Sequence, residues 1–181
     1  MKFKYIGRIR QTGSVWPSSS MLARAMFDTA SLYLDQYDEV LFAGVGNGAI
    51  AGLFARIDKR VVFIDIDREF CQHFRSHIGP GQEVVCLDVQ DYLVRRTNVS
   101  AKRLIVSCVP MRGAFRSDTL RDAFLEQVAR GSTLVFYSYL PYPPWRSGGL
   151  RAAGMDIGVT RRAAVLRNIP PAFVYSIGAR S

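Results

Sequence analysis

A strand, a glycine-rich turn and a carboxylate constrain this chain more than any other feature. An apolar run, Val40–Ala43, breaks into the alternating glycines Gly44, Gly46 and Gly48 and then resumes with helical character. This pattern predicts a strand, a tight turn and a helix start, with a backbone that a ligand can approach closely. A second apolar run ends at Asp65, whose carboxylate can accept hydrogen bonds from ribose hydroxyls. The sequence therefore predicts a nucleoside pocket.

Two cofactor classes use this layout, and the spacing of the glycines helps to distinguish them. The dinucleotide fingerprint G-x-G-x-x-G/A fits loosely as Gly44-x-Gly46-x-x-Ala49, with a pyrophosphate at the helix start. The spacing G-x-G-x-G fits more closely and resembles motif I of class I S-adenosylmethionine (SAM) methyltransferases, where the turn cradles an amino acid and a ribose. A dehydrogenase usually needs a further domain for its substrate, and 181 residues leave little room for one. SAM is therefore favoured over NAD.

The alternation of strand-like and helical patterns after Glu39 indicates the fold class. It predicts an α/β protein with a mostly parallel sheet and helices on both faces. Two strand-like segments, 159–168 and 172–178, are joined through Asn168–Pro171, and we expect them to finish the sheet as an antiparallel hairpin. The other expected strands are 40–43, 60–65, 83–87, 103–108 and 133–139, and the expected helices start near 47 and 67, pass through 92 and cover 117–129.

The segment before the first strand is predicted to be a helical lid. We divide the chain into the segment 1–36, a lid or a membrane-contacting segment, and a SAM-binding Rossmann-like domain, 37–181, which is a single compact unit. Pro17 and Ser18–Ser20 open a helix that is able to close over the pocket. Basic and apolar residues alternate over 1–12, which suits an interfacial helix on anionic lipid; an ordinary helix packed on the domain is the alternative.

Charge and cysteine usage limit where the protein works. The net charge of +9 is spread along the chain and favours anions such as nucleic acid, an anionic membrane or an acidic small molecule, or it reflects an arginine-rich genome. Cys71, Cys86 and Cys108 lack metal-ligand spacing, so we expect buried thiols and no metal site. No apolar run reaches the length of a membrane span, and the start lacks the apolar region of a signal peptide. A cytoplasmic protein, at most peripheral at the inner membrane surface, is expected.

Cofactor contacts are expected just after the carboxyl ends of the strands, where ligands bind in open α/β sheets. Asp88 either accepts a hydrogen bond from an adenine amino group, while Val89 packs on the ring, or only caps the next helix. Asp67 is interpreted as the N-cap of the helix that follows it. The predicted cofactor contacts are Gly44, Gly46, Gly48, Asp65, Ile66, Asp88, Val89 and Ser107.

Motifs along most of the chain carry a family resemblance. Val15–Ser20 with Leu22–Met26 is similar to a "GA-x-x-PSS-x-x-LA-x-x-M" opening, Val106–Pro110 to "VSGLP", and Arg167–Ala172 to an "RNLPPA" hairpin after a fifth strand like Val135–Tyr139. In this order they resemble the bacterial phospholipid N-methyltransferases and, through them, the group that includes the ribosomal RNA adenine dimethylases. The resemblance implies a seven-stranded Rossmann-like class I methyltransferase fold, SAM as cofactor, and methylation of an amine, foremost on a phosphatidylethanolamine-type headgroup.

The expected acceptor contacts follow the fourth and fifth strands. Ser107 and Tyr139 are the predicted catalytic residues, one as a hydrogen-bond acceptor and the other as an aromatic face for the ammonium. Catalysis would come mainly from proximity and orientation. Core packing is the alternative for each aromatic side chain, and a solvent-facing position is the alternative for Arg112. The predicted substrate contacts are Trp16, Pro110, Arg112, Tyr137 and Tyr139.

Three departures from the family's pattern keep other functions open. Phe42 stands where the family's first strand carries an acid that helps position the cofactor's amino acid part. Cys108 replaces a glycine of the fourth motif, and Met111-Arg112 stand where apolar residues are usual. The fourth motif also lacks the amide and aromatic that hold a flipped base, which disfavours nucleic acid. The alternatives are a soluble small-molecule SAM enzyme, including one using a different carbon of the sulfonium, an NAD-linked oxidoreductase, and a non-catalytic SAM-binding module.

Overall fold

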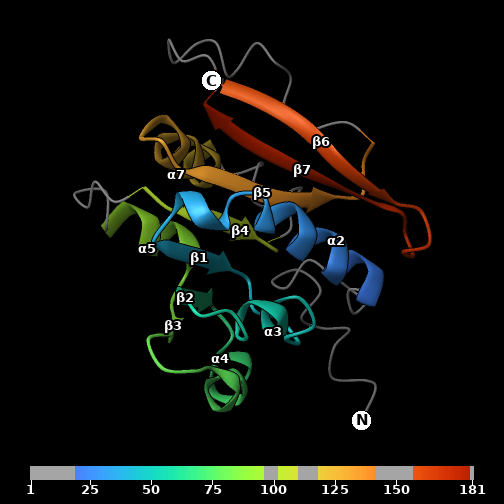
Figure 1. Cartoon of the computed structure of the whole chain (residues 1–181). Helices are drawn as coiled ribbons and strands as arrows, with labels where there is room; N and C mark the ends of the chain where they lie inside the picture. Colours follow the sequence, from blue (N-terminus) through green and yellow to red (C-terminus); the bar gives the residue numbers. More distant parts are fainter. Residues whose placement is uncertain (1–18, 96–101, 110–117, 142–156, 180–181) are drawn as a thin grey trace.

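Seven strands form one sheet whose order brings distant loops to the same edge. The computed structural model describes residues 19–95, 102–109, 118–141 and 157–179. The strand order is β3-β2-β1-β4-β5-β7-β6, with β1 to β5 parallel and β7 antiparallel to both of its neighbours (Figure 1). The predicted mostly parallel sheet with a C-terminal antiparallel hairpin is thereby confirmed. The strands are β1 (Glu39–Ala43), β2 (Arg60–Asp65), β3 (Glu83–Cys86), β4 (Leu104–Ser107), β5 (Thr133–Ser138), β6 (Ile157–Val165) and β7 (Ala172–Ala179).

Helices cover both faces of the sheet, as the alternating pattern predicted. The helices α2, α3 and α4 pack on one face, and α5 and α7 pack on the other. Because the central strands β4 and β5 are buried on both faces, their sequences are almost continuously apolar. Among the described residues, no helix has the length and hydropathy to cross a membrane. The helices are α2 (Ser20–Ser31), α3 (Ala51–Phe54), α4 (Arg68–Phe74), α5 (Val89–Arg95) and α7 (Asp118–Ala129).

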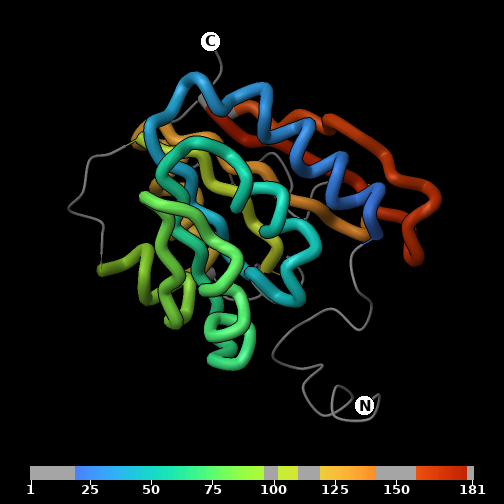
Figure 2. The backbone as a smooth tube through the Cα atoms, turned by 60° about the horizontal axis from the view of Figure 1, so that its bottom comes forward, coloured from blue at the N-terminus to red at the C-terminus, as the bar shows by residue number. Residues whose placement is uncertain are grey.

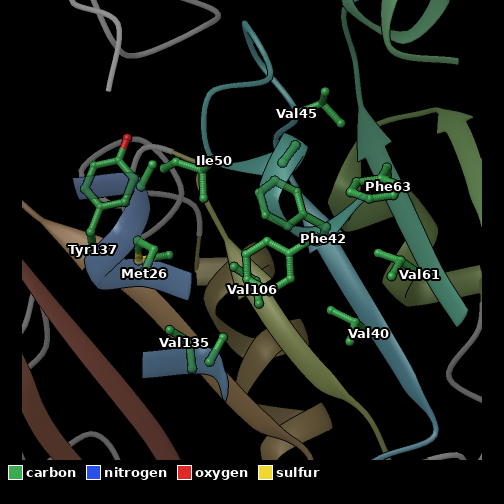
Figure 3. Close-up of a cluster of buried hydrophobic side chains, with 14 of the residues drawn as sticks. Met26, Val40, Phe42, Val45, Ile50, Val61, Phe63, Val106, Val135 and Tyr137 are labelled. Atoms are coloured by element: carbon green, nitrogen blue, oxygen red, sulfur yellow. The ribbon is translucent and has the colours of Figure 1, made fainter. Parts of the chain in front are cut away.

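A row of five aromatic rings fills the core between the sheet and α2, α3 and α4. The rings of Phe27, Phe54, Phe42, Phe63 and Phe74 follow one another with centroid separations of 5.2, 5.2, 5.7 and 4.9 Å. Figure 3 shows Phe42 and Phe63 within this cluster. Phe42 is fully buried, so the position that is acidic in the resembled family is a packing position here.

Helix α2 is joined to the β6–β7 hairpin at both of its ends. At its start, the hydroxyl of Ser19 donates a hydrogen bond to Oδ1 of Asn168 at 2.6 Å. Beyond its end, the hydroxyl of Tyr33 donates to Oγ of Ser176 at 3.0 Å and accepts from Nη2 of Arg162 at 2.6 Å. Figure 2 shows the helix lying along the hairpin over its whole length. The helix is therefore part of the packed core; a lid function for the segment 1–36 stays a prediction.

Candidate functional site

The glycine turn after β1 adopts backbone angles that other residues rarely take. Gly44, Gly46 and Gly48 have φ values of 87°, 53° and 81°. A side chain at Gly48 would touch the ring of Phe74, 3.4 Å away, whereas a Cβ at Gly46 would meet nothing within 4 Å. Because positive φ cannot continue a right-handed helix, α3 starts only at Ala51, and the predicted start near residue 47 is too early.

The first glycine lies directly against the loop that follows β4. A Cβ at Gly44 would approach the carbonyl carbon of Cys108 and the nitrogen of Val109 to 3.1 Å. The same two loops are joined by the N–H of Cys108, which donates to the carbonyl oxygen of Ala43 at 2.7 Å. Only glycine fits this crossing without moving backbone. The crossing closes one side of the site and brings the β1 and β4 loops together.

The carboxylate of Asp65 is held by the glycine turn. Its Oδ2 accepts a hydrogen bond from the backbone N–H of Gly46 at 2.8 Å, and its Oδ1 accepts one from the N–H of Asp67 at 2.8 Å. Burial raises the pKa of Asp65 above its usual value of 3.8, and these two N–H groups offset only part of that effect. Each carboxylate oxygen has a further lone pair, so Asp65 is oriented and still able to accept from a ligand.

A cavity of about 650 Å³ opens beside this carboxylate at the carboxyl ends of β1 to β4. It brings together the predicted contacts Gly44, Gly46, Asp65, Ile66, Asp88 and Val89. Sequence reasoning did not assign a cavity role to the first turn of α4, although this turn directly follows the β2 carboxylate. The remaining lining residues are Ile64, Asp67, Arg68, Glu69, Phe70, Leu87, Cys108 and Val109.

The cavity is acidic although the chain is basic. Asp65, Asp67, Glu69 and Asp88 line it, against the single cationic lining residue Arg68, whereas the whole chain carries a net charge of +9. Unlike charges attract more strongly where burial limits screening by water. The lining therefore favours a ligand with a cationic or neutral centre over a polyanion such as a pyrophosphate.

Two of these aspartates also begin helices. Oδ1 of Asp67 accepts from the N–H of Glu69 at 2.9 Å, which confirms it as the N-cap of α4. Oδ1 of Asp88 accepts from the N–H of Gln90 at 2.7 Å, so this residue caps α5 while lining the cavity. The two interpretations of Asp88 are compatible, because a cap uses only part of its hydrogen-bonding capacity.

Several predicted contacts lie outside the cavity lining. Ser107 faces the α5 and α7 side of β4 and is 1% exposed, and its hydroxyl has no hydrogen-bond partner among the described residues. Tyr137 and Tyr139 form an edge-to-face pair with centroids 5.5 Å apart at the end of β5. Figure 3 shows Tyr137 beside Met26, with its hydroxyl pointing away from the cluster. Gly48 packs under Phe74, and Trp16, Pro110 and Arg112 fall outside the described residues.

Cys108 lines the cavity and also packs against the hydrophobic core on the α2, α3 and α4 side of the sheet, the cluster to which Tyr137 belongs. Burial raises the pKa of its thiol far above the usual value, and raises that of Cys71 to about 12, so both are neutral at physiological pH. Cys108 is therefore a small apolar part of the cavity wall. Among the described residues, no group of three His, Cys, Asp or Glu side chains could hold a metal ion.

Comparison with known proteins adds structural neighbours but no sequence relative. No protein-family model and no curated protein matches the chain. A SAM-dependent methyltransferase from Anabaena variabilis superimposes with a TM-score of 0.64 at 11% identity over 98% of this chain and 93% of that one. Magnesium protoporphyrin IX methyltransferase from Synechocystis with bound SAM gives 0.59 at 11% identity over 99% and 93%. An rRNA methylase from Streptococcus thermophilus gives 0.56 at 13% identity over 92% and 100%.

These likenesses establish the fold. The chain has the Rossmann-like architecture of class I SAM-dependent methyltransferases, with the antiparallel strand β7 inserted between β5 and β6. Its cavity occupies the carboxyl ends of the strands, where open α/β sheets bind their ligands.

Proposed function

We propose that this protein is a SAM-dependent methyltransferase that alkylates an amine, foremost the amine of a phosphatidylethanolamine-type headgroup. The observation that carries the proposal is the hydrogen bond between Asp65 and the N–H of Gly46. It joins the two features that the sequence predicted for an adenosine site, the glycine turn and the carboxylate that ends β2. The proposed setting is the cytoplasm, with peripheral contact to the inner membrane surface.

The residues around the cavity fit the parts of the cofactor. Asp65 would accept hydrogen bonds from the ribose hydroxyls, and the open side of Gly46 would leave room for the amino acid part. Ile66, which is 60% exposed beside the cavity, and Val89 would pack on the adenine ring. The bound cofactor would supply a methyl group activated by a sulfonium.

Two observations favour SAM over NAD. The classic dinucleotide-binding sheet has the order 3-2-1-4-5-6, whereas this sheet has the antiparallel β7 between β5 and β6. The four carboxylates that line the cavity would repel a pyrophosphate, and they suit a sulfonium. NAD-linked chemistry therefore remains only as an outcome of the binding test below.

The chain's own residues would orient the acceptor rather than act as strong bases. An amine must be neutral to displace the methyl group in line, and partial desolvation beside a cation lowers the pKa of an ammonium. The edge-to-face pair of Tyr137 and Tyr139 would offer ring faces to a methylated ammonium at the carboxyl end of β5, the strand next to β4. Ser107 would accept a hydrogen bond from the substrate amine only if that amine reaches the α5 and α7 side of β4.

A soluble small-molecule acceptor is the second candidate, and Cys108 is the observation that favours it. The resembled family has glycine at this position, so the cysteine side chain occupies part of the cavity that glycine would leave open. A smaller cavity suits a small acceptor better than a bulky lipid.

Titration calorimetry with S-adenosylhomocysteine and with NADH tests the cofactor. We expect binding of S-adenosylhomocysteine alone, and loss of that binding in Asp65→Ala. The matched control is Asp38→Ala, an exposed aspartate that precedes β1 at the opposite edge of the sheet. Binding of NADH alone, or equal loss of S-adenosylhomocysteine binding in both variants, would contradict the proposal.

A second assay identifies the acceptor. The protein is incubated with methyl-labelled SAM and, separately, with phosphatidylethanolamine vesicles, a soluble amine extract and ribosomal RNA. Label in the lipid supports the headgroup proposal, and label in the amine extract supports the second candidate. Label in RNA alone would overturn both, and would show that the residues after β4 hold a base without the usual amide and aromatic.

A further inference from the structure

A small apolar surface projects from the turn of the β6–β7 hairpin. Leu166 and Ile169 are 70% and 78% exposed, the two highest values among the large apolar side chains of the described residues. Pro170 and Pro171 are exposed beside them, and Met21 at the start of α2 is 41% exposed. We call Leu166, Ile169, Pro170 and Pro171 the hairpin tip. Single exposed aliphatic residues are ordinary, whereas a group of them marks a contact surface.

The hairpin tip is held in shape by polar contacts beneath it. Asn168, between the two exposed aliphatic residues, is 4% exposed. Its Oδ1 accepts from the hydroxyl of Ser19, and its Nδ2 donates to the carbonyl oxygen of Pro170, both at 2.6 Å. The contact with Ser19 brings the start of α2 beside the turn, as Figures 1 and 2 show. Because the surface is already formed, docking would need little additional ordering of the chain.

The charge around the hairpin tip is positive. The segment from Ile157 to Ala179 contains Arg161, Arg162 and Arg167 and no aspartate or glutamate. Arg161 and Arg167 are exposed, and Arg167 directly follows Leu166. Apolar side chains next to Arg167, with Arg161 further along β6, match an anionic bilayer, in which the aliphatic groups enter the acyl boundary and the guanidinium groups meet phosphates.

The hairpin tip lies at the same edge of the sheet as the cavity. Phe173 at the start of β7 pairs with Ser138 at the end of β5, so the turn extends beyond the carboxyl ends of the parallel strands. Neighbouring strands are about 4.8 Å apart, which puts β7 roughly 10 Å from β4. The cavity, the tyrosine pair and the hairpin tip therefore follow one another along a single edge.

We propose that the hairpin tip docks this edge of the protein onto an anionic lipid bilayer. A second copy of the chain fits the surroundings less well, because the edge strand β6 carries exposed arginines and an irregularity between Arg161 and Ala163, both of which oppose strand pairing. The docking itself does not require methyl transfer. A role for this docking in presenting the cavity to lipid headgroups rests on the proposed function.

Co-sedimentation of the full chain with vesicles, without cofactor, tests the docking. We expect binding to vesicles containing phosphatidylglycerol, weaker binding to pure phosphatidylcholine, and release at high salt. The double variant Leu166→Ser, Ile169→Ser should lower the partition coefficient at least about tenfold, since two aliphatic side chains leave the bilayer. The matched control is Leu32→Ser, Val94→Ser, whose residues are 62% and 55% exposed away from the turn; it should bind like the unmodified chain.

The remaining outcomes separate this inference from the proposed function. Equal vesicle binding by the hairpin-tip variant and the unmodified chain would overturn the docking proposal, as would equal losses in the two double variants. Conversion of a dimer to a monomer by the hairpin-tip variant, with unchanged vesicle binding, would assign the surface to self-association instead. Binding of S-adenosylhomocysteine should be the same in all these proteins, so a failure of docking leaves the cofactor site untouched.

Discussion

Nη1 of Arg103 lies 3.3 Å from Oε1 of Glu39, at the edge of the sheet opposite the cavity. The Arg103 side chain is only 2% exposed, while Glu39 also binds Nε of the exposed Arg60 at 2.9 Å. The carboxylate of Glu39 thus forms ion pairs with one buried and one solvent-facing guanidinium. The buried partner makes this pair important for folding, because removing one member of a buried pair takes away compensation for the other charge.

Glu39→Ala is expected to lower the free energy of unfolding by about 3–5 kcal/mol, because the buried Arg103 loses its carboxylate. Arg60→Ala should cost at most about 1 kcal/mol, since its side chain is 58% exposed and screened by water. Urea denaturation followed by circular dichroism measures both. Similar losses in the two variants would show that burial of Arg103 does not control the energetics of this pair.

Substitutions at two glycines of the turn should separate stability from binding. Gly44→Ala forces a Cβ against the backbone of Cys108 and Val109 in a left-handed conformation, so we expect a loss of more than about 2 kcal/mol in unfolding free energy. Gly46→Ala has free space and should cost only about 1–2 kcal/mol, while its methyl group obstructs the ligand. Thermal melts and S-adenosylhomocysteine titrations distinguish them. A larger stability loss at Gly46 than at Gly44 would contradict the crossing of the β1 and β4 loops.

Ligand binding should depend on pH through Asp65. Its pKa is raised above 3.8 in the folded protein, mainly by burial. The contribution of this group to stability is therefore complete below pH 3.8 and is lost as the pH rises through its folded pKa. Binding has the opposite trend, because ribose hydroxyls donate to the ionised form. Calorimetry across the acidic range should show affinity rising with pH, and Asp65→Asn should remove that dependence.

Placing the acid of the resembled family at position 42 should damage the fold rather than improve binding. The ring of Phe42 is fully buried between Phe54 and Phe63. Phe42→Glu places an ionisable group among these rings, so we expect a loss of more than about 4 kcal/mol. Phe42→Leu is the control and should cost about 1–3 kcal/mol. A stable Phe42→Glu protein with increased affinity for S-adenosylhomocysteine would show that the side chain reaches the cofactor.

The sheet and its helices were predictable because local signals agree with the tertiary structure. Buried strands give continuous apolar runs, and Asp65, Asp67 and Asp88 follow strands where caps and ligand contacts occur. The start of α3 was predicted too early, because the three alternating glycines with positive φ delay the helix until Ala51. That delay depends on backbone angles, which apolar periodicity does not report.

The candidate site was only partly predictable, because cavity walls depend on contacts between segments. Apart from the N-cap Asp67, no sequence pattern indicated that the first turn of α4 lines the cavity. Phe42 packs between two other phenylalanine rings, which accounts for an aromatic residue where the resembled family has an acid. This packing becomes visible only when the strands are paired. Likewise, exposure of Leu166 and Ile169 follows from the buried Asn168 between them, which an apolar pattern alone does not reveal.

The hydrogen bonds between α2 and the β6–β7 hairpin also affect how these two segments unfold locally. Ser19 and Tyr33 connect the first described helix to residues near the end of the chain, through contacts that span 149 and 143 positions of sequence. Segments tied in this way exchange their amide hydrogens through one shared opening event rather than separately. Helix α2 and the β6–β7 hairpin would then protect each other from proteases, so that cleavage in one loosens both.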